Sequence, residues 1–400
     1  MFFPHFKLWF FLFNLLNKRY SIKIASTLQE REAVFKFRHQ IYVNELGYTF
    51  LCEDNQKDML FDEYDFMPNS VIIYSGDVNH ITGTIRMTVW DRENFPLKKE
   101  EEYLINKNLL AHFVNAGEIN FFQVRKENRK GFLGLALISF LYKVALDPRF
   151  NPDIVFLHCF PGLIEQYFTT GGFIYTSQAV LNAYGTLLIP MAIAPFDFNF
   201  LKENKCITYG IAKDCLSLFK NKVSDEVYKT KCQNLSAIFP HISIYFKRHD
   251  IAIYRSNIDD QDIKKQFDFL ISLIQKGIVI YIKKNTAIIK SNLIDYDIFL
   301  LMEGKVGVFF ENVLIAEIKP GMLFGEMAQL HPHHKRQSDV YSLTDVKIML
   351  IPRNLLIKLE RKDIKLANKW LHFLCDELIQ KLNNTNRLLY EKIKDKGQSK

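Results

Sequence analysis

The stretch Pro320-Gly-Met-Leu-Phe-Gly-Glu-Met-Ala-Gln-Leu330 is the most specific pattern in the chain, and an arginine follows it at position 336. Gly325 permits a close backbone approach to a ligand because it has no Cβ atom. The guanidinium fork of Arg336 matches the oxygens of a phosphate, and the carboxylate of Glu326 is suited to accept a hydrogen bond from a sugar hydroxyl. The stretch therefore predicts a turn that binds a phosphate-bearing ligand.

The sequence around this turn is typical of a small antiparallel β-roll, because short apolar runs alternate with Asp, Asn and Gly. The predicted strands are Ile278–Ile282, Ala287–Lys290, Ile298–Met302, Val306–Phe310, Leu314–Ile318 and Lys347–Ile351. Amphipathic sequence from Asn354 to Leu389 follows, and we expect helices there.

From about Gln266 to Leu389 the chain resembles cyclic nucleotide-binding domains, on the turn, on Ile288-Ile-Lys-Ser-Asn292, on Glu303-Gly-Lys-Val-Gly307 and on Leu343-Thr-Asp345. The resemblance implies cyclic AMP or cyclic GMP as an effector. The residues implied to bind it are Phe324, Gly325, Glu326, Met327, Ala328, Arg336, Gln337 and Ser338.

Two positions depart from the family pattern in a direction that weakens binding. Gln337 stands where small residues are usual, and Asp339 brings a negative charge near the ligand. A β-roll used only for packing is therefore an alternative. The histidines at 331, 333 and 334 lie on a loop with no carboxylate or cysteine partner, so no metal site is expected.

The N-terminal half has an α/β pattern, with a helix predicted over Leu28–Gly47 and another over Leu137–Leu146. Strands are predicted at Val71–Tyr74, Gly83–Val89, Glu118–Val124 and Ile154–Cys159. Between the last two strands, the turn from Gly131 to Ala136 precedes a helix, where backbone N–H groups favour a phosphate. The charge run from Lys98 to Glu102 is interpreted as a solvated face.

Residues 21–194 resemble the N-acyl amino acid synthases and acyl-homoserine-lactone synthases, which have the GNAT acyltransferase fold. The matching motifs are Phe37-Arg-His-Gln-Ile-Tyr-Val-Asn-Glu-Leu-Gly-Tyr48, Phe61-Asp-Glu-Tyr-Asp65, Gly83-Thr-Ile-Arg-Met87, Glu118-Ile-Asn120 and Gly172-Phe173. The resemblance implies transfer of an acyl group from a thioester to an amine, which needs a base and donors for the thioester oxygen.

The site residues that this resemblance implies fall into three groups. Glu118 is the predicted catalytic base, with a carboxylate that faces only water as the alternative. Arg38, Asp62, Asp65 and Arg86 form the predicted substrate-binding cluster, with ordinary surface ion pairing as the alternative. Val124, Gly131, Gly134 and Ala136 are predicted to bind the acyl donor.

Two departures shape the prediction. Lactone synthases carry an arginine where Phe121 stands, so an amino acid or another amine is preferred as acceptor over S-adenosylmethionine. Gly131 opens the pyrophosphate loop in place of Arg or Gln, with Arg129 and Lys130 upstream. Acyl carrier protein phosphopantetheine and CoA are therefore both retained as donors.

Length and composition set the domain organisation. The chain has 400 residues, 48% hydrophobic, and a net charge of +8 that is scattered, which predicts a globular protein with no nucleic-acid partner. The predicted parts are an apolar N-terminal helix (1–20), the acyltransferase domain (21–200), a helical connector (201–265), the nucleotide domain (266–390) and a polar tail (391–400). Six scattered cysteines argue against disulfides and structural zinc.

The apolar segment over residues 2–17 is too short to span a membrane and lacks the pattern of a secretion signal. A helix at the membrane interface and a helix that covers a groove of its own protein are both retained. We expect a cytoplasmic location, peripheral at the inner face of the membrane if the first alternative holds.

Taken together, the sequence predicts a two-domain α/β N-acyltransferase whose activity is regulated by a cyclic nucleotide. A nucleotide-controlled protein-lysine acetyltransferase and a non-catalytic sensor with a GNAT-like docking domain remain as alternatives.

Overall fold

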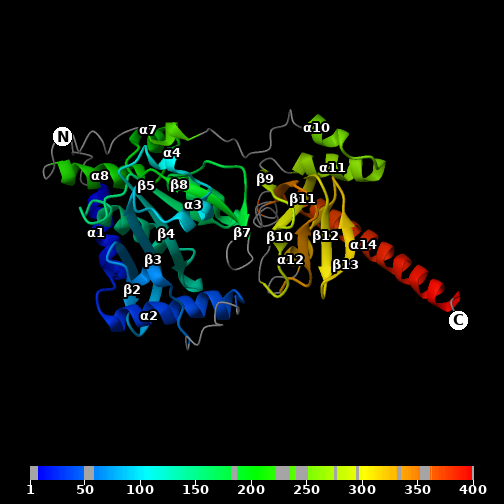
Figure 1. Cartoon of the computed structure of the whole chain (residues 1–400), viewed down its shortest axis with the longest axis horizontal. Helices are drawn as coiled ribbons and strands as arrows, with labels where there is room; N and C mark the ends of the chain where they lie inside the picture. The colour runs from blue at the N-terminus through cyan, green and yellow to red at the C-terminus, as the bar shows by residue number, and fades with distance from the viewer. Residues whose placement is uncertain are drawn as a thin grey trace.

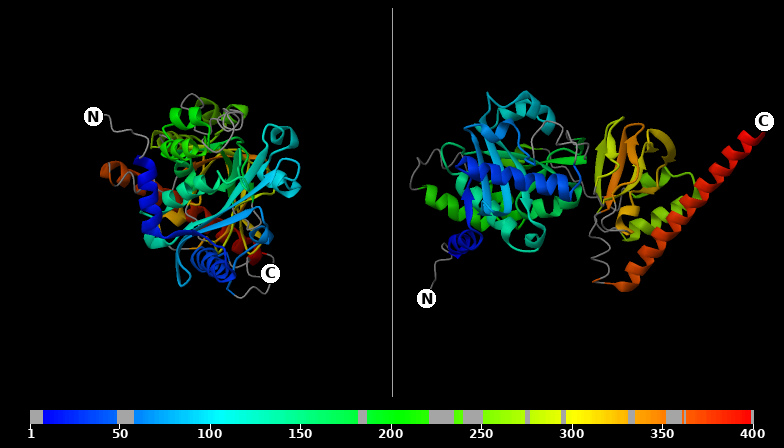
Figure 2. Two further views of the ribbon diagram at one scale, coloured as in Figure 1. Left: turned by 90° about the vertical axis from the view of Figure 1, so that its left-hand side faces the viewer. Right: turned by 90° about the horizontal axis from the view of Figure 1, so that it is seen from below.

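The computed structural model describes residues 8–48, 58–181, 187–220, 235–239, 251–273, 277–293, 297–330, 335–351, 361 and 363–398. These residues form two domains that lie side by side, a mixed sheet with helices and a β-roll with helices (Figures 1 and 2). The predicted two-domain fold class is confirmed.

A mixed sheet organises the N-terminal domain, with strand order β1-β2-β3-β4-β5-β8-β6 and with β7 paired to β8. Its strands are β1 (Ile22–Ile24), β2 (Ser70–Asp77), β3 (His80–Asp91), β4 (Asn115–Val124), β5 (Ile154–Cys159), β6 (Gly172–Ile174), β7 (Val180–Leu181) and β8 (Leu187–Ile193). Neighbouring strands are antiparallel except β4 and β5, which run parallel. The β4–β5 pairing ends at Ile119 and Leu157, although both strands continue.

Helices surround this sheet, some packed on it directly and others packed on a neighbouring helix. They are α1 (Leu8–Tyr20), α2 (Leu28–His39), η2 (Gln40–Glu45), η4 (Glu63–Phe66), α3 (Leu97–Tyr103), α4 (Lys107–Leu110), η5 (Lys126–Asn128), α5 (Leu133–Val144), η6 (Pro161–Leu163), α6 (Ile164–Thr169), α7 (Phe198–Glu203), α8 (Tyr209–Lys220) and η7 (Leu235–Ile238). Helix α2 begins with a capping box in which Thr27 and Glu30 bond each other's backbone N–H groups. It continues into η2, a π-helical turn of a kind often found at functional sites.

The C-terminal domain consists of two four-stranded antiparallel sheets, β10-β15-β12-β13 and β14-β11-β16-β9. The strands are β9 (Ile278–Ile282), β10 (Ala287–Ile289), β11 (Ile298–Glu303), β12 (Val306–Phe310), β13 (Val313–Ile318), β14 (Leu323–Phe324), β15 (Asp339–Ser342) and β16 (Val346–Ile351). The helices are α10 (Ile251–Ser256), α11 (Gln261–Leu273), α12 (Met327–Leu330) and α14 (Ile364–Gln398). Helix α14 buries Trp370 and Leu374 against the roll and then projects away from it (Figure 2).

The hydrophobic cores of the two domains are continuous. One cluster of buried side chains includes Leu187 and Ile189 of the mixed sheet together with Ile280 and Ile288 of the β-roll. This packing places the roll at the edge of the mixed sheet near β7 and β8 (Figure 1). The domains therefore meet directly along a buried face.

The helix at the N-terminus and the helix that follows the mixed sheet both pack on the N-terminal domain. Helix α1 contacts α5 and α8, and its Leu16 and Tyr20 pack against the main hydrophobic cluster. This packing matches the interpretation that α1 covers a groove of its own protein, while Leu15 stays 53% exposed. Residues 1–7 lie outside the described part. Within the described residues, every helix lacks either the length or the apolar character that crossing a membrane requires.

The predicted domain boundaries remain a prediction. Of the expected connector over 201–265, helix α8 buries Ile211 and Leu216 in a cluster with Tyr142 of α5. Helix α11 buries Phe267 and Leu270 in the cluster that contains β11 and β16. Each described end of the segment is therefore packed on the domain next to it.

Candidate active site and nucleotide cassette

A cleft of about 660 Å³ opens where β4 and β5 separate. Its lining includes β4 from Ile119 to Val124, His158 on β5, and Ile41 and Tyr42 of the π-helical turn. This volume lies in the range of small-molecule binding sites. The cleft is thus large enough for a small-molecule ligand and is a candidate for the reaction site.

The backbone of β4 bulges within the cleft. Opposite β3, the register shifts between Thr84 and Arg86, which pair with Gln123 and Asn120. Phe121 has a positive φ of 51° at this point. Because a bulge leaves the extra residue outside the hydrogen-bond ladder, backbone polar groups of β4 become available to a ligand in the cleft.

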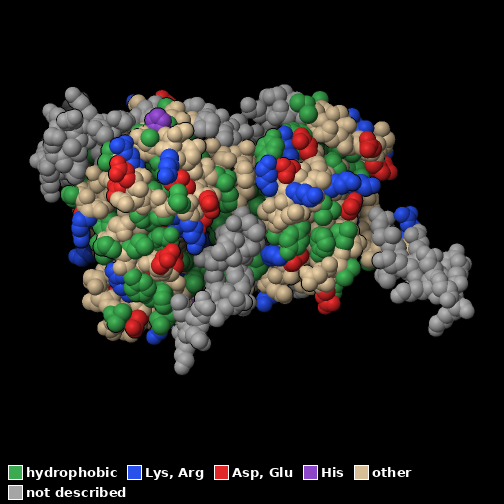
Figure 3. Space-filling model, in the orientation of Figure 1, with side chains coloured by type: hydrophobic (Ala, Val, Ile, Leu, Met, Phe, Trp, Pro, Cys, Tyr) green, Lys and Arg blue, Asp and Glu red, His purple; other side chains and the backbone are tan. Residues whose placement is uncertain are grey.

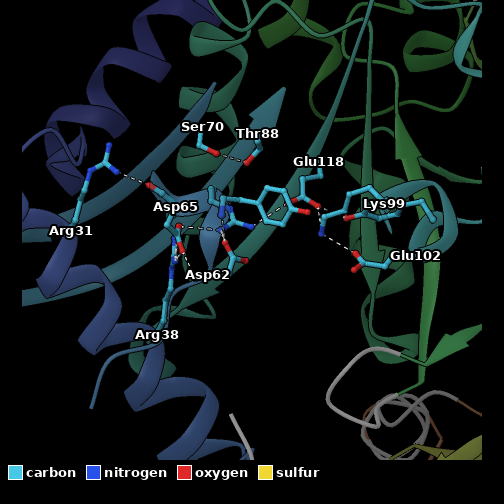
Figure 4. A network of polar contacts seen from close by, with 12 residues as sticks. Arg31, Arg38, Asp62, Asp65, Ser70, Thr88, Lys99, Glu102 and Glu118 are labelled. Carbon is cyan, nitrogen blue, oxygen red and sulfur yellow. Dashed lines mark hydrogen bonds and ion pairs between the residues drawn. The ribbon is translucent and has the colours of Figure 1, made fainter. Parts of the chain in front are cut away.

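A buried network of charges lies on one face of the sheet beside the cleft (Figure 4). Arg38 Nη1 donates to both carboxylate oxygens of Asp65 at 2.9 and 2.8 Å. Arg86 forms ion pairs with Asp62, with Asp65 at 3.2 Å and with Glu118 at 3.1 Å. The structure thus brings Glu118 and the four residues of the predicted substrate cluster together.

The network also holds residues that the sequence analysis placed elsewhere. Lys99 Nζ lies 2.9 Å from Glu118 Oε2 and 2.8 Å from Glu102 Oε2, and the Tyr103 hydroxyl donates to Glu118 Oε2 at 3.2 Å. Lys99 is only 5% exposed. The interpretation of residues 98–102 as a wholly solvated face is therefore wrong for Lys99, because helix α3 turns this side chain inward to neutralise a buried carboxylate.

Glu118 is fully buried between these partners. Burial alone would raise the pKa of its carboxyl, but the charges of Lys99 and Arg86 outweigh burial and hold the pKa below its usual value. The pKa of Asp65 is lowered in the same way, since the charges of Arg38 and Arg86 outweigh burial. The role of Glu118 as catalytic base stays a prediction. The same ion pairs would equally allow Glu118 to hold Arg86 and Lys99 in place.

His158 lines the cleft and was not identified from the sequence. Its Nε2 donates to the Glu102 carbonyl oxygen at 2.9 Å, which leaves Nδ1 without a proton. Its ring stacks on Tyr103 with centroids 4.3 Å apart. Burial lowers the pKa of the imidazole below its usual 6.5, so His158 is neutral at neutral pH and has the protonation state of a general base.

Gln123 is a second cleft residue that sequence reasoning missed. It is 6% exposed and lines the cleft, and neither its Nε2 nor its Oε1 has a hydrogen-bond partner among the described residues. An unpaired buried amide is costly, so such groups call for an explanation. A polar group of a bound ligand would supply the missing partner.

The four predicted donor-binding residues follow the bulge. Val124, Gly131 and Gly134 line the cleft, whereas Ala136 is buried in the hydrophobic core of the domain. Gly131 precedes α5 and Gly134 lies in its first turn. The structure thus brings three of the four to one end of the cleft, beside a helix N-terminus that favours a phosphate.

The predicted nucleotide cassette is assembled in the β-roll around Arg336. Its Nη1 donates to the Gly325 carbonyl oxygen at 2.7 Å, and its Nη2 donates to the Asp297 carbonyl oxygen at 2.6 Å. Glu326 Oε1 accepts a hydrogen bond from Lys381 of α14 at 2.8 Å. A Cβ atom at Gly325, whose φ is 82°, would lie 2.9 Å from the Asp297 oxygen, so only glycine fits without strain.

The other predicted cassette residues flank this core. Phe324 and Ala328 are buried, Met327 is 60% exposed, and Gln337 and Ser338 follow Arg336 at the surface side. Asp339, predicted to weaken binding, accepts a hydrogen bond from the Ser291 N–H at 2.7 Å and pairs with Lys290. Its charge is thus partly neutralised. The three loop histidines lie outside the described residues.

Each half of the chain matches the model of a known protein family. Residues 33–184 match the family model of the N-acyl amino acid synthase FeeM, and residues 279–363 match that of the cyclic nucleotide-binding domain. The chain joins an acyltransferase domain to a cyclic nucleotide-binding domain. The predicted family resemblances and the predicted enzyme class are therefore confirmed.

Solved structures show similarity to each half. A cyclic nucleotide-binding domain from Methylobacillus flagellatus KT is 18% identical, with 35% of this chain and 81% of that chain covered and a TM-score of 0.29. The catabolite activator protein of Thermus thermophilus is 18% identical over 34% of this chain and 61% of that chain, with a TM-score of 0.25. The CoA-dependent acyl-homoserine lactone synthase BjaI is 15% identical, with 46% of this chain and 90% of that chain covered and a TM-score of 0.32. No curated protein matches the chain.

Proposed function

We propose that this chain transfers an acyl group from a thioester, carried by CoA or by acyl carrier protein, to the amino group of an amino acid or a related amine, under control of a cyclic nucleotide. The observation that carries the proposal is the cleft at the β4 bulge, where a neutral imidazole and an unpartnered amide share one cavity.

Acyl transfer needs three contributions that the cleft residues are suited to supply. The amine nitrogen attacks the thioester carbonyl, the C–N bond forms, the C–S bond breaks and the thiol leaves. A base takes a proton from the amine nitrogen, and His158 and Glu118 are the two candidates. Backbone N–H groups at the Phe121 bulge are suited to stabilise the oxyanion, because a ligand in the cleft meets β4 there.

The acceptor is proposed to bind on the face of Phe121 and Gln123. Phe121 contacts the buried cations, with its ring centroid 4.1 Å from Arg38 Cζ and 4.9 Å from Arg86 Cζ. The Gln123 amide can donate to a carboxylate oxygen, which an amino acid acceptor would bring. Phe121 occupies the position of the arginine of lactone synthases, which supports an amine acceptor other than S-adenosylmethionine.

Control by nucleotide is proposed to act through Arg336. A phosphate in the cassette would compete for the guanidinium with the carbonyl oxygens of Gly325 and Asp297. Asp297 also lines the cleft. A ligand that prefers one arrangement of these contacts therefore biases the state of the cleft, which is the requirement for allosteric coupling.

Mass spectrometry of reaction products tests the proposed function. The purified full chain is incubated with acyl-CoA donors from acetyl to palmitoyl and with a mixture of amino acids, with and without cyclic AMP or cyclic GMP. N-acylated amino acids that form only with active protein support the proposal. The Gln123→Leu variant is the matched comparison, since it removes the cleft amide at similar volume and should form the same products less efficiently at low amino acid concentration.

Two results would overturn the proposed function, and a third would reject only its regulatory part. Acetylation of lysine peptides with acetyl-CoA alone, and no product with amino acids, would identify a protein acetyltransferase. Nucleotide binding by calorimetry without any turnover would identify a non-catalytic sensor. Acylation at the same rate with and without saturating, bound nucleotide would reject the regulatory part alone.

A further inference from the structure

One wall of the reaction cleft comes from the nucleotide domain. Ile288 and Ile289 of β10, together with Leu293 and Phe299, line the same cavity as β4 and β5. All four side chains are buried and apolar. Two charged residues of the same domain, Lys290 and Asp297, also line the cavity, and Lys290 is paired with Asp339. The apolar part of the wall matches a hydrocarbon chain, since apolar surface gains from covering apolar surface.

Backbone hydrogen bonds fix this wall against the acyltransferase domain. The Ala179 N–H donates to the Tyr281 carbonyl oxygen at 3.0 Å, and the Tyr281 N–H donates to the Ser177 carbonyl oxygen at 2.9 Å. On the other side, a Cβ atom at Gly47 would lie 3.3 Å from the Asn292 oxygen. The nucleotide domain therefore meets the acyltransferase domain at two separate places, near β9 and near the π-helical turn.

The same wall is built onto the nucleotide cassette. The Arg336 N–H donates to the Leu293 carbonyl oxygen at 2.9 Å, and the Asn292 N–H donates to the Arg336 carbonyl oxygen at 2.9 Å. A Cβ atom at Gly325 would lie 3.2 Å from Ile289 Cδ1. Residues that face the cleft thus touch the residues predicted to hold the nucleotide phosphate.

We propose that the cyclic nucleotide-binding domain forms part of the acyl-chain pocket, so that both domains together select the length of the transferred chain. The inference rests on the proposed function and adds its specificity determinant. Leu293 is the central residue, because it faces the cleft with its side chain and is bonded to Arg336 through its carbonyl oxygen.

Two substitutions at Leu293, one to a larger and one to a smaller side chain, test the proposal in the full chain. Each methylene that loses its place in the pocket lowers binding about fourfold. Leu293→Trp is expected to lower kcat/KM for palmitoyl-CoA about tenfold or more while octanoyl-CoA is used as before. Leu293→Ala is expected to shift the preference toward longer chains. Opposite shifts from one position cannot result from general unfolding.

Ile315→Trp is the matched control, because Ile315 lies on β13 of the same domain, is 51% exposed and is not one of the residues that line the cleft. Figure 3 shows hydrophobic side chains on the outer surface of the β-roll. This variant is expected to keep the parent's chain-length profile. Profiles unchanged in both Leu293 variants would overturn the proposal. An equal fall for all donors would also overturn it, because it would indicate contact with the part of the donor that all thioesters share.

A binding measurement separates this inference from the proposed reaction. A palmitoyl-CoA analogue with a diazirine at the end of the chain is irradiated with the protein, and labelled peptides are identified by mass spectrometry. Label on the peptide that contains Leu293 supports the wall even where no amine is acylated, which would reject the reaction alone. Label only on acyltransferase peptides would overturn the wall and leave the reaction standing.

Discussion

Two sites in this chain each combine a buried arginine with a buried glutamate, yet their partners differ in kind. In the acyltransferase domain, Arg86 and Glu118 pair with each other, and neither side chain is exposed. In the nucleotide cassette, Arg336 bonds two backbone carbonyl oxygens, and Glu326 pairs with Lys381 from a distant helix.

We interpret the first site as a framework of paired charges and the second as the proposed nucleotide-binding site. Buried charges that neutralise one another are expensive to disturb, because removal of one partner leaves the other uncompensated in a medium of low dielectric. Backbone carbonyls and a lysine that is 28% exposed are partners that a ligand can replace at small cost. We therefore expect mutations in the first site to change stability and mutations in the second to change affinity.

The largest expected effect is the loss of stability in Asp65→Asn. This substitution removes the charge that faces both Arg38 and Arg86, all three being fully buried. The free energy of unfolding is expected to fall by about 3–5 kcal/mol, as for other broken buried ion pairs. Urea denaturation followed by circular dichroism measures it.

Asp62→Asn is the control for this prediction. Asp62 also pairs with Arg86, but its side chain is 36% exposed and it caps a short helix, a task that asparagine performs equally well. The free energy of unfolding of Asp62→Asn is expected to fall by about 1 kcal/mol or less. Equal losses of unfolding free energy in Asp65→Asn and Asp62→Asn would refute the distinction between a buried framework of charges and exchangeable partners.

The next effect concerns the base in the cleft and distinguishes His158 from Glu118. His158→Gln is expected to lower kcat by about 100-fold or more, because general base catalysis contributes at least this factor. Since burial lowers the imidazole pKa, the acid limb of the parent's kcat/KM profile should have its midpoint below pH 6.5. Activity is then retained at neutral pH and lost as the pH falls through the lowered pKa.

The variant His158→Gln should lose this limb, while Glu118→Gln should keep it. The opposite result, with the limb lost only in Glu118→Gln, would support the sequence-based assignment of Glu118 as base. Thermal melts of both variants are needed beside the kinetics, because Glu118→Gln also leaves Lys99 and Arg86 short of a buried partner.

A smaller effect is expected from Gln123→Leu, which should make the protein more stable while it weakens binding of the amine acceptor. The substitution removes two buried polar atoms that have no partner among the described residues, so the free energy of unfolding should rise by about 1 kcal/mol. The KM for the amine acceptor should rise about tenfold, since one hydrogen bond is lost. A stable variant with an unchanged acceptor KM would show that the amide serves no ligand.

The smallest effect tests the exchangeable partner in the cassette. Lys381→Met frees the Glu326 carboxylate from its ion pair, and cyclic nucleotide affinity should increase up to about fivefold. Calorimetry with cyclic AMP and cyclic GMP measures it. Lys369→Met, at an exposed position of the same helix, should leave affinity unchanged. Weaker binding in Lys381→Met would mean that the lysine itself holds the ligand.

The sequence predicted local elements well where their apolar period was regular. The ranges Ile154–Cys159, Ile278–Ile282 and Val306–Phe310 agree with β5, β9 and β12. Strand β15 was missed because Asp339 and Ser342 interrupt its apolar pattern, although its alternating side chains are buried. The helix expected over residues 28–47 ends as a π-helical turn, which periodicity does not distinguish from an α-helix.

The site was predictable only where motifs carried it. The predicted ionic residues do meet, since Arg38, Asp65, Arg86 and Glu118 form one network. His158 was missed because it stands alone on an apolar strand, and its proximity to β4 arises from a parallel pairing that the sequence does not specify. The contribution of the nucleotide domain to the cleft depends on packing between distant segments, for which the sequence held no signal.

The hydrogen bonds between Tyr281 and residues 177–179 have a consequence for how such a protein would respond in a cell. The nucleotide domain is part of the same chain as the acyltransferase domain and packs on it. Its effective concentration at the acyltransferase domain is therefore set by the chain and does not depend on the expression level. Under the proposed control by nucleotide, one sensor would serve each catalytic centre at every protein concentration. The nucleotide concentration alone would then set the output, and dilution of the protein would leave the response curve unchanged.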